Sequence, residues 1–183
     1  LRWEEKEGLP FGVHHPITFA NATHGFALSG STSASFDTKL FYVYEASTNT
    51  WTDLTYNSAY AFPGMARSLG YAVVSQLDCG NSKAYIGFGT TTTTDGSKSP
   101  LNDLWEFDMN TGQWTELASL PDKGRQHPAM NFIEELGVIH VGLGNGYDGN
   151  YNDWWSYSIA TNSWTQLPAV SYTHLTLPTS TTV

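Results

Sequence analysis

A seven-residue segment that ends in Trp-Thr-x-Leu occurs three times in this chain of 183 residues. The copies are Thr48–Leu54, Thr111–Leu117 and Thr161–Leu167. A unit of about 50 residues that recurs along a chain predicts stacked copies of one supersecondary structure. The shared positions then build the scaffold, and binding is expected in the loops that differ between copies.

Each copy of the unit predicts four short strands. Aromatic residues precede each repeated tryptophan at alternate positions, as in Tyr42 and Tyr44 before Trp51, which is the period-two pattern of a strand. No stretch shows sustained helical periodicity. In the last copy the expected strands are about His127–Ile133, Val138–Leu143, Asp153–Ser158 and Ser163–Leu167. Four such strands per copy, separated by Gly and Asn turns, predict the blades of an all-β β-propeller.

The turn before each repeated tryptophan can also be predicted. The position two residues before Trp is Asn49, Gly112 or Asn162. Asn and Gly tolerate positive φ better than other residues, so this position is expected to be left-handed in a tight hairpin. The tryptophan that follows is large enough to fill the space between neighbouring blades, and we interpret it as structural rather than as a ligand contact. The predicted structural tryptophans are Trp3, Trp51, Trp114 and Trp164.

These features together resemble the kelch-repeat family. The second strand of each copy ends in glycine, at Gly30, Gly89 and Gly144, the third strand is aromatic, and tryptophan lies in the fourth. Kelch repeats usually have two adjacent glycines, whereas two copies here have a Gly-x-Gly form, which resembles kelch-like repeats of bacterial secreted and surface proteins. The strongest matches are Asn102–Phe107 and Asn152–Tyr157, and the resemblance covers about Leu1–Pro168.

The blade count predicts a propeller fragment in residues 1–168. Three blades are expected at about Phe11–Leu54, Phe62–Leu117 and Gly124–Leu167, with an orphan fourth strand around Trp3. A closed propeller typically has 4–8 blades, so the missing blades of a longer chain are expected as partners. Residues 169–183 fit no further copy and are expected to be a non-native or disordered tail. Val170–Val183 resembles a translated sequencing-library adaptor; a Thr-rich linker to another domain is the alternative.

Composition limits the classes of function. The formal charge is −9, which disfavours nucleic acids and anionic membrane surfaces as partners. No hydrophobic run approaches the roughly 18 residues of a membrane span. The single cysteine, Cys79, argues against a disulfide scaffold. The low charge and abundant Thr, Ser, Asn and Tyr favour an extracellular, periplasmic or cell-surface location, with the cytoplasm as the alternative.

No catalytic, cofactor-binding or metal-binding motif is recognised in the sequence. His15 and His127 are aligned in one repeat slot, filled by Arg67 in the middle copy, which favours a structural role over metal ligation. The run Asp148–Asp153 has oxygen ligands beside a glycine, but we interpret it as a polar hairpin rather than a calcium site. The sequence therefore predicts a non-catalytic protein.

The loops that vary between copies are expected to share one face of the propeller. They are Ser31–Lys39, Thr90–Leu101, Asn145–Asn152, Thr55–Met65 and Ala118–Arg125. A protein- or glycan-binding module is the first functional hypothesis, since variable loops on a rigid scaffold usually carry binding. Part of a kelch-fold enzyme, such as a carbohydrate oxidase or sialic acid epimerase, and a structural arc of a surface adhesin are the alternatives. The candidate binding residues are Tyr60, Arg67, Lys98, Arg125, Tyr147, Asp148 and Tyr151.

Overall fold

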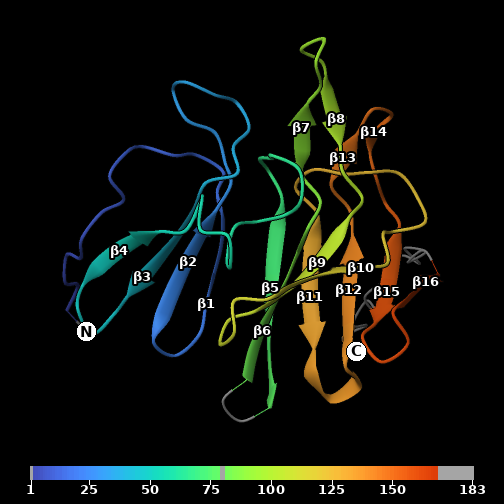
Figure 1. The fold of residues 1–183 in the computed structure, drawn as a ribbon. Coiled ribbons are helices and arrows are strands. Elements are labelled where there is room, and N and C mark those ends of the chain that lie inside the picture. Colours follow the sequence, from blue (N-terminus) through green and yellow to red (C-terminus); the bar gives the residue numbers. More distant parts are fainter. Residues whose placement is uncertain (1, 79–80, 169–183) are drawn as a thin grey trace, which may run out of the picture.

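The computed structural model describes residues 2–78 and 81–168, which form three four-stranded antiparallel sheets arranged side by side (Figure 1). Cys79 and the predicted tail at 169–183 lie outside the described residues. Each sheet is one predicted blade. Blade 1 contains β1 (Ile17–Ala20), β2 (His24–Leu28), β3 (Phe41–Glu45) and β4 (Thr50–Asp53). Blade 2 contains β5 (Tyr71–Asp78), β6 (Asn81–Gly87), β9 (Leu104–Asp108) and β10 (Trp114–Leu117). Blade 3 contains β11 (Ala129–Ile133), β12 (Val138–Gly142), β15 (Trp154–Ser158) and β16 (Ser163–Leu167).

The all-β propeller fragment expected from the repeat is therefore confirmed, with every predicted strand of the last copy present. The first strands are the ones that meet between blades, since β5 packs against both β1 and β11. One expectation is wrong. Residues 2–5 form no strand and Trp3 is 100% exposed, because the described residues contain no third strand with which a fourth could pair.

The core lies between the blades rather than within any one of them. Blade 1 and blade 2 meet through aromatic rings, with Phe41 edge-on to Phe107 at 5.3 Å between ring centroids. Blade 2 and blade 3 meet through a second cluster, in which Tyr85 stacks on Phe132 at 6.0 Å. Aromatic pairs at these separations contribute beyond the area that they bury. Each blade is thus stabilised mainly by its neighbours.

The repeated glycines are required where the end of each second strand passes close to the segment that enters the same blade. Gly30, Gly89 and Gly144 all have positive φ, at 93°, 89° and 81°. A Cβ on Gly89 would lie 2.3 Å from the Ser68 carbonyl oxygen, so no other residue fits there. The backbone N–H of Gly30 donates to the Arg67 carbonyl, and that of Gly89 donates to the Arg125 carbonyl. Gly30 and Gly89 therefore connect blades 1 and 2 to the start of the blade that follows each of them.

Each repeated tryptophan faces an aromatic partner directly across its hairpin. Tyr44, Phe107 and Tyr157 are the register partners of Trp51, Trp114 and Trp164. The turn position before each tryptophan has positive φ, at 55° for Asn49, 75° for Gly112 and 47° for Asn162, as the sequence predicts. Cross-strand aromatic pairs stabilise antiparallel hairpins. The interchange of Asn and Gly in the turn follows from its left-handed conformation.

The same tryptophans also hold the connections between blades. The indole N–H of Trp114 donates to the carbonyl of Tyr60 at 2.8 Å, and that of Trp164 donates to the carbonyl of Ala118 at 2.7 Å. Trp51 makes the matching bond to the carbonyl of Glu7 at 2.9 Å. Each accepting residue lies in the segment that enters the tryptophan's own blade. The prediction that these three tryptophans are structural is therefore supported by their contacts.

Candidate functional site

The long loops lie at one end of the arc, which we call the long-loop face. Two of them contain small hairpins, formed by β7 (Thr90–Thr92) with β8 (Lys98–Pro100) and by β13 (Asn145–Gly146) with β14 (Gly149–Asn150). Both hairpins rise from the same end in Figure 1, whereas the opposite end carries short turns and the 3-10 helix η1 (Glu134–Leu136). The predicted separation of long loops from short turns is thus seen in the structure. The hairpins inside the loops were not predicted.

Two of the predicted binding residues, Arg67 and Arg125, are buried and have structural partners. The Arg67 guanidinium makes a two-point ion pair with Asp103, with nitrogen–oxygen distances of 2.8 and 2.5 Å, and it is 0% exposed. The Arg125 guanidinium pairs with Asp153 in the same way, at 2.8 Å for both bonds. Both groups also donate to backbone carbonyls, of Phe88 and Leu143. Neither residue is free to bind a ligand, which corrects the sequence prediction.

The geometry of these arginines also corrects the alignment of the repeats. The residues that form isolated bridges to the loop after each second strand are His14, Ser68 and Gln126. Arg67 and Arg125 each precede this bridge residue, so they are equivalent positions. The residue after it has positive φ in all three blades, at His15, Leu69 and His127. Leu69, rather than Arg67, therefore fills the slot of the two histidines.

The remaining candidate residues divide into structural and exposed groups. Tyr60 packs its ring against Gly112, and Tyr151 lies under the Arg125 guanidinium at 5.0 Å from its ring centroid. Tyr147 is 73% exposed on the β13–β14 hairpin. Asp148 forms an ion pair with Lys123 on the surface. Only Tyr147, Asp148 and Lys98 thus remain on the long-loop face as accessible candidates.

Asp37, which the sequence did not single out, joins the long loops of blade 1 and blade 2. Its carboxylate accepts hydrogen bonds from Ser68 at 2.7 Å and from Thr92, and it pairs with Lys98 at 2.8 Å. Lys98 also lies 5.1 Å from the ring centroid of Phe36, within range of a cation–π interaction. We call Asp37, Ser68, Thr92 and Lys98 the Asp37 network. It holds the 31–40 loop against the β7–β8 hairpin.

The charge of Asp37 is stabilised by this network. Burial by itself raises the pKa of a carboxyl group, but the bonds from Lys98, Thr92 and Ser68 outweigh that effect and hold the pKa of Asp37 below its usual value. The Arg125 guanidinium likewise lowers the pKa of Asp153. Both carboxylates are therefore committed to partners within the protein. Since Asp153 pairs with Arg125 and Asp148 with Lys123, the alternative of a calcium site at Asp148–Asp153 lacks free carboxylates.

Three histidines lie near the start of the inner strands on the long-loop face. The Nδ1 atoms of His14 and His15 are 2.7 Å apart, and the ring centroids of His15 and His127 are 5.8 Å apart. All three residues are exposed. Within residues 2–78 and 81–168, no three His, Cys, Asp or Glu side chains are arranged to hold a metal ion. The histidines thus border the long-loop face without forming a metal centre there.

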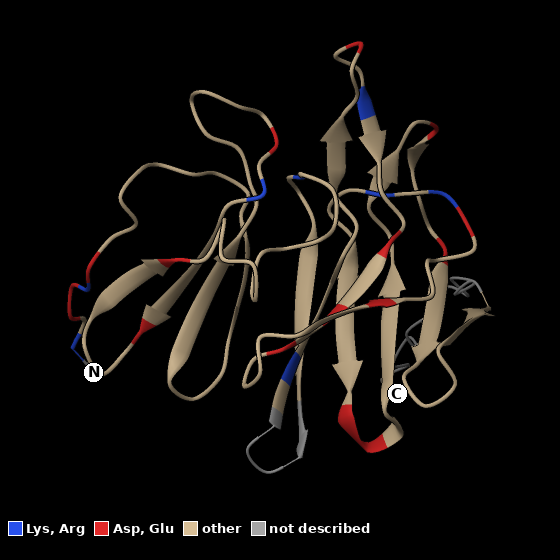
Figure 2. Cartoon of the chain, in the orientation of Figure 1, with Lys and Arg blue, Asp and Glu red and all other residues tan. Residues whose placement is uncertain are grey.

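Charged residues are dispersed over the chain rather than gathered into one patch (Figure 2). Lys98 and Lys123 lie on the long-loop face, and each is paired with an aspartate. In the part of the chain that the structure describes, no helix is long and apolar enough to cross a membrane. The accessible features of the long-loop face are therefore aromatic and polar rather than strongly charged.

Acidification is expected to destabilise the fold through the paired aspartates. A carboxyl group with a lowered folded-state pKa contributes fully to the free energy of unfolding above about pH 4, and the contribution is lost as the pH falls through the folded value. Urea unfolding measured between about pH 6 and about pH 3 should show a falling free energy. Asp153→Asn should flatten this dependence. An unchanged midpoint over the whole range would contradict the assignment.

The comparisons with known proteins support the architecture. No protein-family model matches the chain, and no curated protein matches it. Among solved structures, that of YjhT matches with a TM-score of 0.73 and 17% sequence identity, over 94% of this chain and 57% of YjhT. At this identity the likeness shows the fold alone. The chain therefore has the fold of a β-propeller arc and spans a little over half the length of YjhT.

Proposed function

We propose that this chain is part of a non-catalytic, kelch-type propeller whose long-loop face recognises a protein or a glycan. One observation carries the proposal: exposed aromatic residues project from the long loops, and one of these loops is fixed to a neighbouring hairpin. Phe36 is 72% exposed and Tyr147 is 73% exposed, and the Asp37 network holds the loop that carries Phe36. Large aromatic residues exposed on a surface are typical of recognition sites.

The physical chemistry of the face fits recognition. Aromatic side chains bring large contact area with few rotatable bonds, so less conformational entropy is lost when they bind. The Asp37 network reduces this cost further, because the 31–40 loop is already ordered before a partner arrives. Flat apolar rings beside hydroxyl groups of Thr and Ser suit the mixed apolar and polar surface of a saccharide or a peptide. The dispersed charge and the net charge of −9 do not favour a polyanionic partner.

Removing either exposed ring is expected to weaken binding. The purified chain would be applied to arrays of glycans and of purified proteins, and the affinity of each hit would be measured by calorimetry. Phe36→Ala and Tyr147→Ala should each lower the affinity by at least about tenfold if the rings are anchor residues. Both residues are exposed, so the variants should keep the thermal stability of the parent chain.

A matched control lies at the other end of the arc. Leu136 is 70% exposed in η1, on the end that carries the short turns, and Leu136→Ala should leave every affinity unchanged. The proposal is wrong if no ligand on either array binds. It is also wrong if Leu136→Ala weakens binding as much as the two aromatic substitutions do.

A further inference from the structure

Blades 2 and 3 each carry an aromatic pair on the side that faces the blade before them. The pair joins a third-strand aromatic residue to the repeated tryptophan of the fourth strand. The ring centroids are 4.5 Å apart for Phe107 and Trp114 in blade 2, and 5.1 Å apart for Tyr157 and Trp164 in blade 3. Phe107 packs against Phe41 of blade 1, and Tyr157 lies in the core between blades 2 and 3. We call this pair the front pair of its blade.

The front pair of blade 1 has the same geometry, but the described residues include no blade in front of it. Tyr44 and Trp51 are register partners with ring centroids 5.2 Å apart. Both residues are partly exposed, whereas Phe107 is 1% exposed and Tyr157 is 0% exposed. An aromatic surface that the other two blades bury is therefore open in blade 1.

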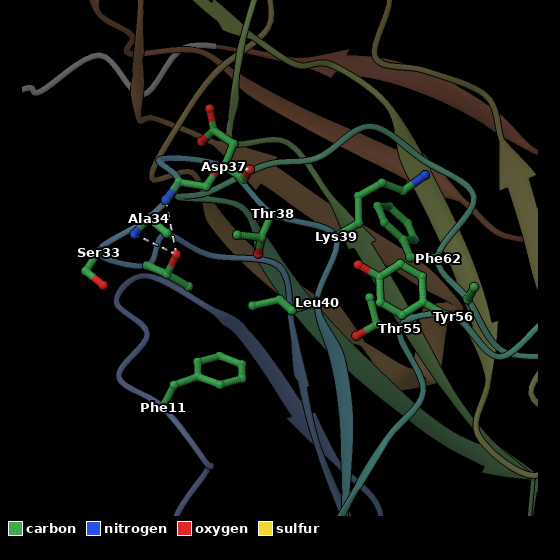
Figure 3. Close-up of a pocket in the computed structure, with 13 residues that line it drawn as sticks. Phe11, Ser33, Ala34, Asp37, Thr38, Lys39, Leu40, Thr55, Tyr56 and Phe62 are labelled. Atoms are coloured by element: carbon green, nitrogen blue, oxygen red, sulfur yellow. Dashed lines mark hydrogen bonds between the residues drawn. The ribbon is translucent and has the colours of Figure 1, made fainter.

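Phe11 extends this open surface toward the 31–40 loop. Its ring meets that of Tyr42 edge-on, with 5.5 Å between the centroids, and the residue is 37% exposed. Figure 3 shows Phe11 across a pocket from Tyr56 and Phe62, which belong to the connection toward blade 2. Phe11 thus lies on the side of blade 1 that faces away from blade 2. The front face of blade 1 consists of Phe11, Tyr42, Tyr44 and Trp51.

The opposite side of a blade receives the front pair of the blade that follows. The first residue of the third strand takes part in this contact, as Phe41 in blade 1 and Leu104 in blade 2, and both are 0% exposed. Trp154 is the equivalent residue of blade 3, since all three pair with the residue two positions before the repeated glycine. Trp154 is partly exposed. Blade 3 thus leaves open the position that blades 1 and 2 bury.

Leu143 adds to the open surface of blade 3. It directly precedes the repeated glycine, as Phe88 does in blade 2, and both residues have positive φ. Phe88 is 0% exposed and lies 6.4 Å from Trp164 between ring centroids, whereas Leu143 is 40% exposed. His140 lies on the same side of the sheet, because it alternates with buried neighbours that face blade 2. We call Trp154, Leu143 and His140 the rear face of blade 3.

We propose that the front face of blade 1 docks on the rear face of blade 3 in a second copy of this chain, so that two copies close one ring. The two faces are the two halves of an interface that the chain already makes twice, between blades 1 and 2 and between blades 2 and 3. A second copy supplies the complementary half at both open ends at once. Three blades from each copy make six, within the range of about 4–8 blades of closed propellers.

The internal junctions indicate which residues meet in this ring. Phe41 contacts both members of the front pair of blade 2. Trp154 of one copy has the position of Phe41, so it should contact Tyr44 and Trp51 of the other copy. Leu143 should contact the same tryptophan, as Phe88 contacts Trp164. Aromatic contacts of this kind supply both area and geometric specificity.

Two further features of the open ends agree with reversible association. Residues 2–5 form no strand and Trp3 is fully exposed, so this segment can move out of the path of β16 of the other copy. His140 stands where blade 2 has Tyr85, which makes the rear face more polar than the internal junctions. We therefore expect a dimer that forms at about 1–100 µM rather than an obligate one.

The mass of the 183-residue chain in solution tests the proposal. Sedimentation equilibrium over about 1–100 µM should show a dimer of twice the chain mass and no larger species. Leu143→Asp places a charge in the rear face and should raise the dissociation constant at least about tenfold. Leu136→Asp is the matched control, since Leu136 is 70% exposed in η1, which contacts β5 of blade 2. It should leave the dissociation constant unchanged.

A second variant tests the front face. Gly25 pairs with Tyr44 as the buried Ala84 pairs with Phe107, and a Cβ at Gly25 would meet only the Cβ of Tyr44, at 3.8 Å. Gly25→Lys should therefore keep the fold and weaken the dimer at least about tenfold. A mixture of Gly25→Lys and Leu143→Asp chains should associate more tightly than either variant alone. In the mixed ring one junction is unaltered, and the other brings opposite charges together.

Four results would overturn the proposal. A chain that stays monomeric up to about 100 µM would leave these faces to a different partner. A mass that keeps rising beyond two copies would mean that the contact forms an open filament instead of a ring. A control variant, Leu136→Asp, that dissociates as readily as Leu143→Asp would remove the rear face from the argument. A mixture that associates no better than its components would exclude the front-to-rear contact.

Discussion

Arg67→Ala is expected to lower the free energy of unfolding by about 3–5 kcal/mol, because it leaves the Asp103 carboxylate without its buried partner. The arginine is 0% exposed, donates to Asp103 twice, and donates once each to the carbonyls of Phe88 and Met65. Its loss therefore removes four charge-assisted bonds in a place that water does not easily reach. Urea unfolding of the parent chain and the variant at neutral pH measures the difference.

The control for this prediction is already present in the molecule. Blade 1 has Val13 and Leu40 at the positions of the arginine and the aspartate. The double variant Arg67→Val with Asp103→Leu should recover most of the stability that Arg67→Ala loses, since removal of both partners leaves no isolated charge. A double variant that is less stable than Arg67→Ala would show that the ion pair is needed for more than its own neutralisation.

The second large effect is expected at Trp114. Its ring packs against Phe41, Phe62 and Phe107 with centroid distances of 5.7, 4.9 and 4.5 Å, and its indole N–H bonds to the carbonyl of Tyr60. Trp114→Ala should therefore cost about 3–5 kcal/mol, since it opens the contact between blades 1 and 2. The free energy of unfolding in urea is again the measurement.

Two further tryptophan variants test the reason for this cost. Trp114→Phe keeps most of the ring contact and loses the bond to Tyr60, so it should cost about 1 kcal/mol plus a packing term. Trp3→Ala should have no effect, because the Trp3 side chain is fully exposed. If Trp3→Ala destabilises the chain as much as Trp114→Ala, the contacts described for Trp114 do not account for its contribution.

The strands and turns could be predicted because they depend on local pattern. The seven-residue distance between Tyr157 and Trp164 places them opposite each other in a hairpin, and the structure pairs them directly. The interchange of Asn49 and Gly112 indicated positive φ, which both residues have. Such features need only the period of a strand and the steric limits of the backbone.

The burial of the arginines could not be predicted in the same way. Arg67 and Arg125 lie in polar connections, where arginine is ordinarily exposed. Their partners, Asp103 and Asp153, are 36 and 28 positions further along the chain. The signal was present in the joint replacement of both partners in blade 1. This joint replacement is visible only when the repeats are aligned correctly. The alignment based on sequence alone placed Arg67 two positions away from its true equivalent.

The Asp37 network depends on contacts between separate segments. Asp37 meets Lys98 across 61 positions, and nothing in the loop that carries Asp37 indicates which hairpin will lie beside it. Pairings of this kind follow from tertiary structure, and a repeat pattern within one blade does not predict them.

The two bonds that Asp37 makes to the β7–β8 hairpin also have a thermodynamic consequence. They cross the boundary between blades 1 and 2, so pulling these blades apart must break them. A ligand that contacts both the 31–40 loop and this hairpin would oppose the same separation. Its binding free energy would add to the free energy needed to separate the two blades. Binding of such a ligand should therefore slow amide hydrogen exchange at a distance from the loops, where Phe41 packs against Phe107.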